Sequence, residues 1–85
     1  MRSKREMKRG ELIMRLTEAE PGMELEIYEL PVGNFKTHFV RLGVIEGTRV
    51  KCIHKLPGGT VVISKRHQEI AVGSEIAKKI MVKKI

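Results

Sequence analysis

The 85-residue chain contains no tryptophan and a single cysteine, Cys52, and its aromatic residues are two phenylalanines and one tyrosine. One cysteine cannot form a disulfide within the chain, and a lone thiol fits a reducing compartment, so we expect a cytoplasmic protein. So few aromatic rings leave no evident platform for stacking nucleic-acid bases or for binding a proline-rich peptide. The longest early apolar run covers only residues 12–14, so we expect neither export nor membrane insertion.

The residue patterns of common active sites are also missing. The chain has no aspartate and no Ser-His-acid arrangement. The Lys-Ser/Thr pair that would complete a phosphate-binding loop does not follow Gly43 and Gly47. A chain of this size buries only about 60% of its unfolded surface, which leaves room for one modest core and no deep pocket. We therefore expect a protein that is not an enzyme.

The net charge is +7, and it is unevenly distributed. Residues 1–10 carry five cations against one glutamate, residues 11–34 carry six glutamates against one arginine, and residues 35–85 carry eleven cations against three glutamates. We expect residues 1–11 to be a disordered basic extension and residues 12–85 to form one domain. A basic surface attracts phosphate-rich partners, so a barrel that binds nucleic acid is an alternative, although the chain lacks stacking aromatics.

Alternation of apolar and polar residues predicts short strands. Leu25 and Ile27 face one way in residues 23–30, and Val50 and Cys52 face inward in residues 48–56. Glycine and proline lie at the expected connections between strands. This punctuation predicts a mainly β protein, a small closed or half-closed antiparallel barrel. The other expected strands are residues 12–16, 60–66, 68–72 and 79–85, with a single helical turn after Gly73.

One short α-helix is predicted over residues 35–42. Phe35, Phe39 and Leu42 recur at helical spacing and form an apolar stripe. Asn34 is the expected N-cap, because its side chain can accept a hydrogen bond from the first turn. A helix of two turns is unstable alone in water, so the phenylalanines must anchor it to the barrel.

The stretch "LGVIEG" after this helix predicts a corner. Gly43 follows the last helical residue, where a positive φ costs glycine little, and Val44 can then fold back on the helix end. Gly47 lets the chain turn into the strand that begins at Thr48. Leu42, Gly43 and Gly47 are therefore expected to hold the helix at one end of the barrel.

Three residues are candidate metal ligands: His38, Cys52 and His54. Cys52 and His54 lie two apart on an expected strand and would share one face, about 6.6 Å apart along it. A structural site needs four ligands, however, and a buried free cysteine usually behaves as a small apolar residue. We expect that the protein requires no cofactor. Binding of a transition metal ion, Fe²⁺ or Zn²⁺, stays an open alternative. A homo-oligomer in which two chains contribute ligands to one metal ion is also open.

Three segments together resemble the FeoA family, and the resemblance covers roughly residues 15–85. They are "LTEAEPGMELEI", "RLGVIEGTRVKC" and "EIAVGSEIAKKIMV". The resemblance implies an SH3-like antiparallel β-barrel with one short inserted α-helix. It also implies a cytosolic accessory protein of ferrous-iron uptake that docks on FeoB, a membrane transporter with its own GTPase domain. The same module is similar to the C-terminal domain of iron-dependent repressors, so a metal-responsive regulator module is a second alternative.

If the protein works by docking, we expect the partner to contact the helix and its corner. Val40 points off the apolar stripe, so a partner could bury it. A single exposed apolar residue is also ordinary on a free protein, and both interpretations stay open. The residues of the expected surface are Thr37, His38, Val40, Arg41, Val44, Ile45 and Glu46.

Overall fold

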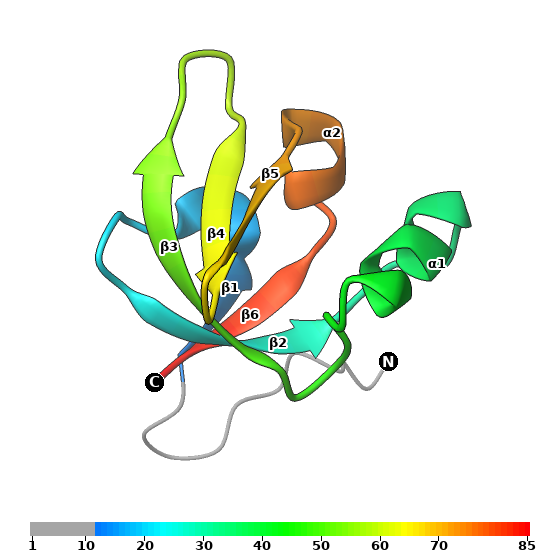
Figure 1. The fold of residues 1–85 in the computed structure, drawn as a ribbon. Coiled ribbons are helices and arrows are strands. Elements are labelled where there is room, and N and C mark those ends of the chain that lie inside the picture. The colour runs from blue at the N-terminus through cyan, green and yellow to red at the C-terminus, as the bar shows by residue number, and fades with distance from the viewer. Residues whose placement is uncertain (1–11) are drawn as a thin grey trace, which may run out of the picture.

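Six antiparallel strands form one sheet in the computed structural model, which describes residues 12–85. The order across the sheet is β1-β6-β2-β3-β4-β5. β3, β4 and β5 run steeply across β2 and β6, so the sheet bends into a half-open barrel (Figure 1). The strands are β1 (Leu12–Arg15), β2 (Glu24–Glu29), β3 (Arg49–Lys55), β4 (Val61–Lys65), β5 (Gln68–Val72) and β6 (Met81–Lys84). Every expected strand is present, and the expected fold class is confirmed. The expected disordered extension lies outside the described residues.

Three short helices connect the strands: the 3-10 helix η1 (Leu16–Glu18), α1 (Asn34–Arg41) and α2 (Ser74–Ala77). α1 stands to one side of the barrel, next to the end of β2 (Figure 1). The expectation that Asn34 caps α1 is wrong, because the N-cap is Gly33 and no side chain caps this end. Gly33 has φ +151°, a conformation that favours glycine, and its carbonyl accepts a hydrogen bond from the Lys36 N–H at 3.0 Å.

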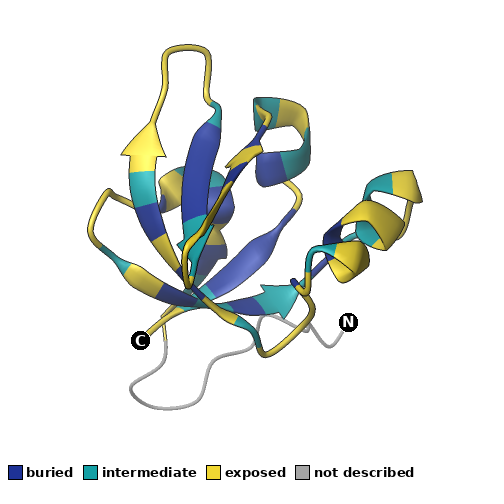
Figure 2. Ribbon diagram, viewed as in Figure 1, coloured by how far each residue is buried: buried dark blue, intermediate teal, exposed yellow. Residues whose placement is uncertain are grey.

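The core lies inside the bend of the sheet (Figure 2). Leu25 and Ile27 are buried while Glu24 is exposed, which confirms the alternation expected in β2. Among residues 12–85, no polar or charged residue is buried, so apolar burial stabilises the fold. Each fully buried leucine, isoleucine or valine contributes about 1.5–3 kcal/mol. The largest fully buried side chains are Leu16, Leu25, Ile27, Ile63, Ile80, Val44, Val61, Val82 and Cys52.

The end of α1 is closed by two backbone hydrogen bonds. The Gly43 N–H donates to the Val40 carbonyl at 2.9 Å, and the Val44 N–H donates to the Phe39 carbonyl at 2.9 Å. This pair of bonds is a Schellman motif with Gly43, at φ +82°, in the left-handed position. Phe39 and Val44 both belong to the core, so the motif brings the helix end onto the barrel.

Gly47 fastens the same corner to β2. Its N–H donates to the Ile27 carbonyl at 2.7 Å, and the Ile27 N–H donates to the Thr48 carbonyl at 2.8 Å. Gly47 has φ +94°, and the Thr48 N–H closes the turn on the Ile45 carbonyl at 3.0 Å. The expected structural roles of both glycines therefore agree with the backbone geometry.

Alanine substitutions should separate backbone strain from side-chain crowding at these glycines. A Cβ at Gly47 meets nothing within 4 Å, so Gly47→Ala tests the positive φ alone, whereas a Cβ at Gly43 also meets the Lys65 Nζ at 3.0 Å. We expect each substitution to lower the free energy of unfolding by about 1–2 kcal/mol in urea titrations.

Gly73 provides the matched control, because its φ is −62° and a Cβ there also meets nothing within 4 Å. Gly73→Ala should change the free energy of unfolding by less than about 0.5 kcal/mol. Equal effects at Gly43, Gly47 and Gly73 would contradict the role given to the left-handed conformation.

Candidate functional site

α1 is anchored through one face and leaves the other exposed. Phe39 is buried, and the Phe35 ring meets it edge-on, with ring centroids 5.7 Å apart and planes at 86°. Leu42 is half-buried against the core, so the expected apolar stripe is present. On the other side, the exposed residues of α1 that were expected at the surface are Thr37, His38, Val40 and Arg41.

The expected docking surface needs one correction. Val44 has no exposed area, so it is not a surface residue. Its N–H is the second donor of the Schellman motif, and that geometry turns its side chain into the core. Its neighbours Ile45 and Glu46 are exposed, as expected.

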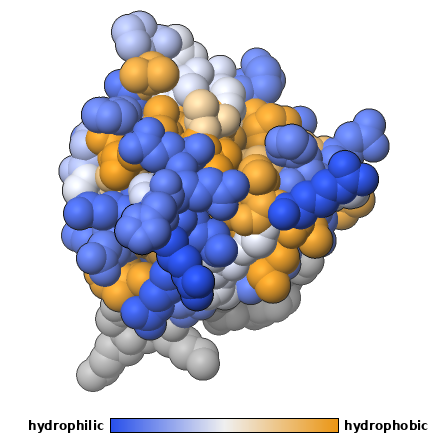
Figure 3. Space-filling view, viewed as in Figure 1, coloured by the Kyte–Doolittle hydropathy of each residue, from blue (hydrophilic) through white to orange (hydrophobic). Residues whose placement is uncertain are grey.

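Three apolar side chains before, within and after α1 are exposed to solvent. Val32 is 93% exposed, Val40 is 50% exposed and Ile45 is 48% exposed. Figure 3 shows apolar surface on the side of the molecule where α1 lies. Val32 was absent from the predicted surface, because "PVGN" was interpreted only as a loop. Its position as a lone apolar residue between proline and glycine was the available signal.

Glu46 is part of the expected docking surface, and it also makes contacts that stabilise the corner. Its carboxylate accepts a hydrogen bond from the Leu30 N–H at 3.4 Å and lies 3.9 Å from the Lys36 Nζ. Leu30 is a core residue at the end of β2, and Lys36 is on α1. Glu46 therefore links the helix to the sheet, and its expected contact with a partner stays a prediction.

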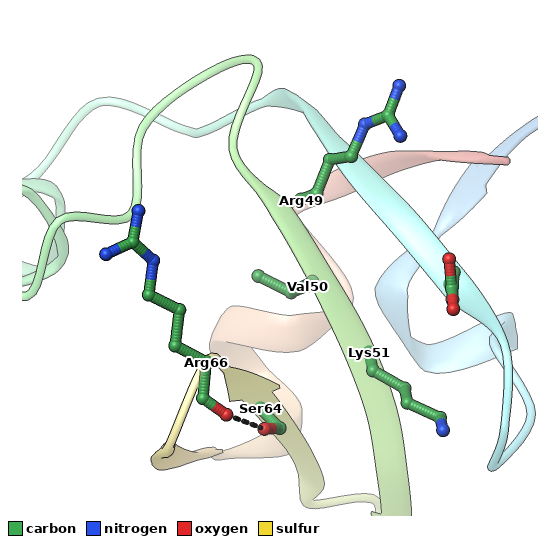
Figure 4. Close-up of a pocket in the computed structure, with 6 residues that line it drawn as sticks. Arg49, Val50, Lys51, Ser64 and Arg66 are labelled. Atoms are coloured by element: carbon green, nitrogen blue, oxygen red, sulfur yellow. Dashed lines mark hydrogen bonds between the residues drawn. The ribbon is translucent and has the colours of Figure 1, made fainter.

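A hollow with basic walls lies on the sheet beside this corner (Figure 4). Its volume is about 260 Å³. Arg49 and Lys51 come from β3, Arg66 comes from the turn between β4 and β5, and Val50 lies between them (Figure 4). Alternation in β3 predicts that Arg49 and Lys51 point outward, but nothing in the sequence places Arg66 opposite them. Glu24 and Ser64 complete the lining.

Arg66 has an unusual backbone conformation. Its φ is +58°, and it is the only non-glycine residue with a positive φ among residues 12–85. Lys65 and Gln68 are paired across the hairpin, so Arg66 and His67 form a two-residue turn. The Ser64 hydroxyl donates to the Arg66 carbonyl at 3.2 Å. A left-handed residue with a Cβ costs about 1–2 kcal/mol.

The expected metal ligands do not come together. Cys52 has no exposed area, whereas His54 is exposed, and the pairing of β3 with β4 shifts by one residue between them. This β-bulge breaks the alternation, so the prediction that the two side chains share one face is wrong. His38 is exposed on α1. No three histidine, cysteine or glutamate side chains within residues 12–85 are grouped closely enough to hold a metal ion.

Comparison with known proteins identifies the family. Residues 14–84 match the FeoA domain. The chain belongs to the FeoA family. Proteins of this family are small non-catalytic accessory domains of the cytosol and are linked to ferrous-iron transport. Within the described residues of this FeoA chain, no helix combines the length and apolar character needed to cross a bilayer.

Solved structures share the fold of this FeoA chain. An iron uptake regulatory protein (FeoA) has 24% identity and a TM-score of 0.76, over 87% of this chain and 99% of that one. The FeoA protein from Chlorobium tepidum has 19% identity and a TM-score of 0.77, over 85% of this chain and 70% of that one. A manganese-dependent transcriptional repressor has 14% identity and a TM-score of 0.76, over 86% of this chain but only 42% of the repressor. No curated protein matches the sequence.

Burial of Cys52 predicts a pH dependence of stability. Desolvation raises the pKa of the Cys52 thiol above its ordinary value of 9.0, although nearby Lys55 acts in the opposite direction. The Cys52 thiol of the unfolded chain therefore loses its proton at a lower pH than that of the folded chain. The free energy of unfolding keeps its full value from this group below about pH 9, and it decreases as the pH rises above that value. Urea titrations between pH 8 and 10 should show a steeper loss for the parent than for Cys52→Ala. Identical slopes would contradict the raised pKa.

Relief of backbone strain at Arg66 should stabilise the protein. Glycine adopts a positive φ without the steric penalty of a Cβ. Glycine also gives the unfolded chain more conformational freedom, and this cancels about 0.5–1 kcal/mol of the stability gained. We expect Arg66→Gly to raise the free energy of unfolding by roughly 0.5 kcal/mol in urea titrations. His67→Gly is the control, because His67 is not among the residues with positive φ and should lose stability. A destabilised Arg66→Gly would show that the arginine conformation is not strained.

Proposed function

We propose that this chain is a cytoplasmic accessory protein of ferrous-iron uptake that docks on the cytosolic side of an FeoB-type membrane transporter through α1 and its corner. The observation that carries the proposal is the exposure of Val32, Val40 and Ile45 around a helix whose other face is anchored in the core. Family membership links the chain to ferrous-iron transport, and it supports the choice of partner.

The anchoring of α1 supports docking because it makes the surface rigid before the partner arrives. Phe39 is buried and the helix end is tied by the Schellman bonds, so little conformational freedom is lost on binding. Exposed apolar side chains supply the area that a partner buries. Arg41 makes no ion pair with any residue from 12 to 85, and it can meet an acidic group at the rim.

Docking of this kind requires neither catalysis nor a cofactor from this chain. The FeoA family is non-catalytic, so we assign GTP hydrolysis to the transporter's own GTPase domain. The apolar residues around α1 need no metal to bind a partner. We expect the complex to persist in EDTA, and titration with Fe²⁺ or Zn²⁺ to give no heat of binding to the isolated chain at neutral pH.

Charge and polarity changes on α1 test the proposed surface. We expect Val40→Asp and Ile45→Asp each to weaken binding to the cytosolic part of the transporter at least about ten-fold, because a buried carboxylate without a partner is costly. Arg41→Glu should also weaken binding, because it places a like charge opposite the acidic group of the partner. The measurement is surface plasmon resonance with the transporter fragment immobilised. Circular dichroism melts of each variant show whether the fold is kept.

Leu56→Asp is the matched control. Leu56 is 46% exposed, close to the 50% of Val40, and lies in the connection between β3 and β4 rather than near α1. It should bind like the parent. If Val40→Asp and Arg41→Glu also bind like the parent, the docking surface has been placed wrongly.

A further inference from the structure

The basic hollow adjoins the proposed docking surface. Arg49 begins β3 directly after the corner that ends at Gly47 and Thr48. The Lys65 Nζ at the end of β4 lies 3.0 Å from where a Cβ on Gly43 would sit, so β4 also reaches the corner. We therefore expect a partner seated on α1 and its corner to lie near Arg49 and the end of β4.

The cations of the hollow make no ion pair within the described chain, whereas four lysines elsewhere do. Lys36, Lys55, Lys78 and Lys83 each lie within 4.0 Å of a glutamate. Across residues 12–85, no carboxylate lies that close to Arg49, Lys51 or Arg66. Among residues 12–85, the hollow therefore gathers three cations without an ion pair and the single carboxylate of Glu24.

The strand register makes the missing ion pairs informative. Glu26 is directly opposite Arg49, and Glu24 is directly opposite Lys51 in the β2–β3 pairing. Opposite charges in such positions usually pair across the strands. Here the Glu26 carboxylate lies 4.0 Å from the Lys83 Nζ on β6, on the other side of β2. Arg49 is consequently left available to an external anion.

An arginine occupies a turn position where glycine would be less strained. Six glycines occupy the other positive-φ positions, yet an arginine occupies this one at φ +58°. Strained conformations of this kind are concentrated at binding and catalytic sites. The Ser64 hydroxyl, which also lines the hollow, holds the Arg66 carbonyl and so helps to fix the turn.

We propose that this hollow binds an acidic peptide segment of the docking partner, in extended conformation across β3. The three cationic side chains spread around Val50 instead of converging on one point (Figure 4). That spacing suits a ligand with several separated carboxylates better than a single phosphate ion. Residues without aromatic rings line the hollow, so it offers no platform for nucleic-acid bases. The inference rests on the proposed docking function, and it adds a second, charge-driven contact to it.

Fluorescence anisotropy with a defined probe tests the site on the full chain. The probe is a fluorescein-labelled decapeptide of alternating glutamate and glycine, titrated at low salt. We expect Arg49→Glu/Lys51→Glu to weaken probe binding at least ten-fold. Lys78→Glu/Lys79→Glu changes the net charge equally on exposed residues outside the hollow and should weaken binding less than three-fold. Equal losses in the two double variants would overturn the proposal, since long-range attraction alone would then explain binding.

A gain of affinity provides a second test that does not depend on a disruptive variant. Among residues 12–85, Glu24 is the only carboxylate that lines the hollow, so Glu24→Gln should tighten probe binding two- to three-fold. Glu75→Gln, on α2, makes the same change in net charge away from the hollow and should have a smaller effect. Arg66→Gly should weaken the probe at least three-fold while keeping the fold. Unchanged affinity in Glu24→Gln and Arg66→Gly would overturn the proposal.

Two further arms identify other occupants. In the first, an eight-nucleotide uridine RNA is titrated in place of the peptide. If the RNA binds more tightly than the peptide, and Arg49→Glu/Lys51→Glu abolishes its binding, the ligand of the hollow is nucleic acid and not an acidic peptide. In the second, sedimentation measures the oligomeric state of the chain alone. If the chain forms a dimer that the same double variant abolishes, the hollow binds a second copy of the chain and not an acidic peptide. Val40→Asp should keep full probe binding, so failure of the hollow is distinguishable from failure of transporter docking.

Discussion

The hydrogen bonds at the corner after α1 are the constraint on which the rest of this protein depends. Gly43 and Gly47 adopt left-handed conformations, and their N–H groups bond to the helix end and to β2. These bonds turn Val44 inward beside Phe39, so that a helix of only two turns keeps a fixed position. Without that corner, residues 34–41 would have too little buried area to remain helical, and the exposed apolar side chains would have no defined arrangement.

The parts of the fold that follow from local chemistry were predictable from the sequence. Alternation identified β2 and β3, and the helical spacing of Phe35, Phe39 and Leu42 identified α1 and its buried face. The Leu-Gly-x-x-x-Gly spacing identified the corner, because few residues other than glycine tolerate a positive φ there. Each of these signals lies within a few residues, which is why no long-range information was needed.

The features that the sequence did not reveal depend on contacts between distant segments. The bulge that separates Cys52 from His54 arises in the pairing of β3 with β4, and alternation along one strand cannot show it. The corner predicted from "LGVIEG" already folded Val44 back on the helix end, but its full burial comes from packing in the core with residues of the strands, so it was wrongly placed on the surface. The hollow combines Arg49 and Lys51 with Arg66 from another hairpin, and only the strand register brings them together.

The burial of Cys52 has a consequence for the reactivity of its thiol. Oxidation of a cysteine to sulfenic and then sulfinic acid proceeds most readily when its thiol is both accessible and ionised. Here the only sulfhydryl of the chain is enclosed by the barrel, and burial raises the pKa of its thiol. Burial therefore disfavours oxidation of Cys52 while the domain stays folded.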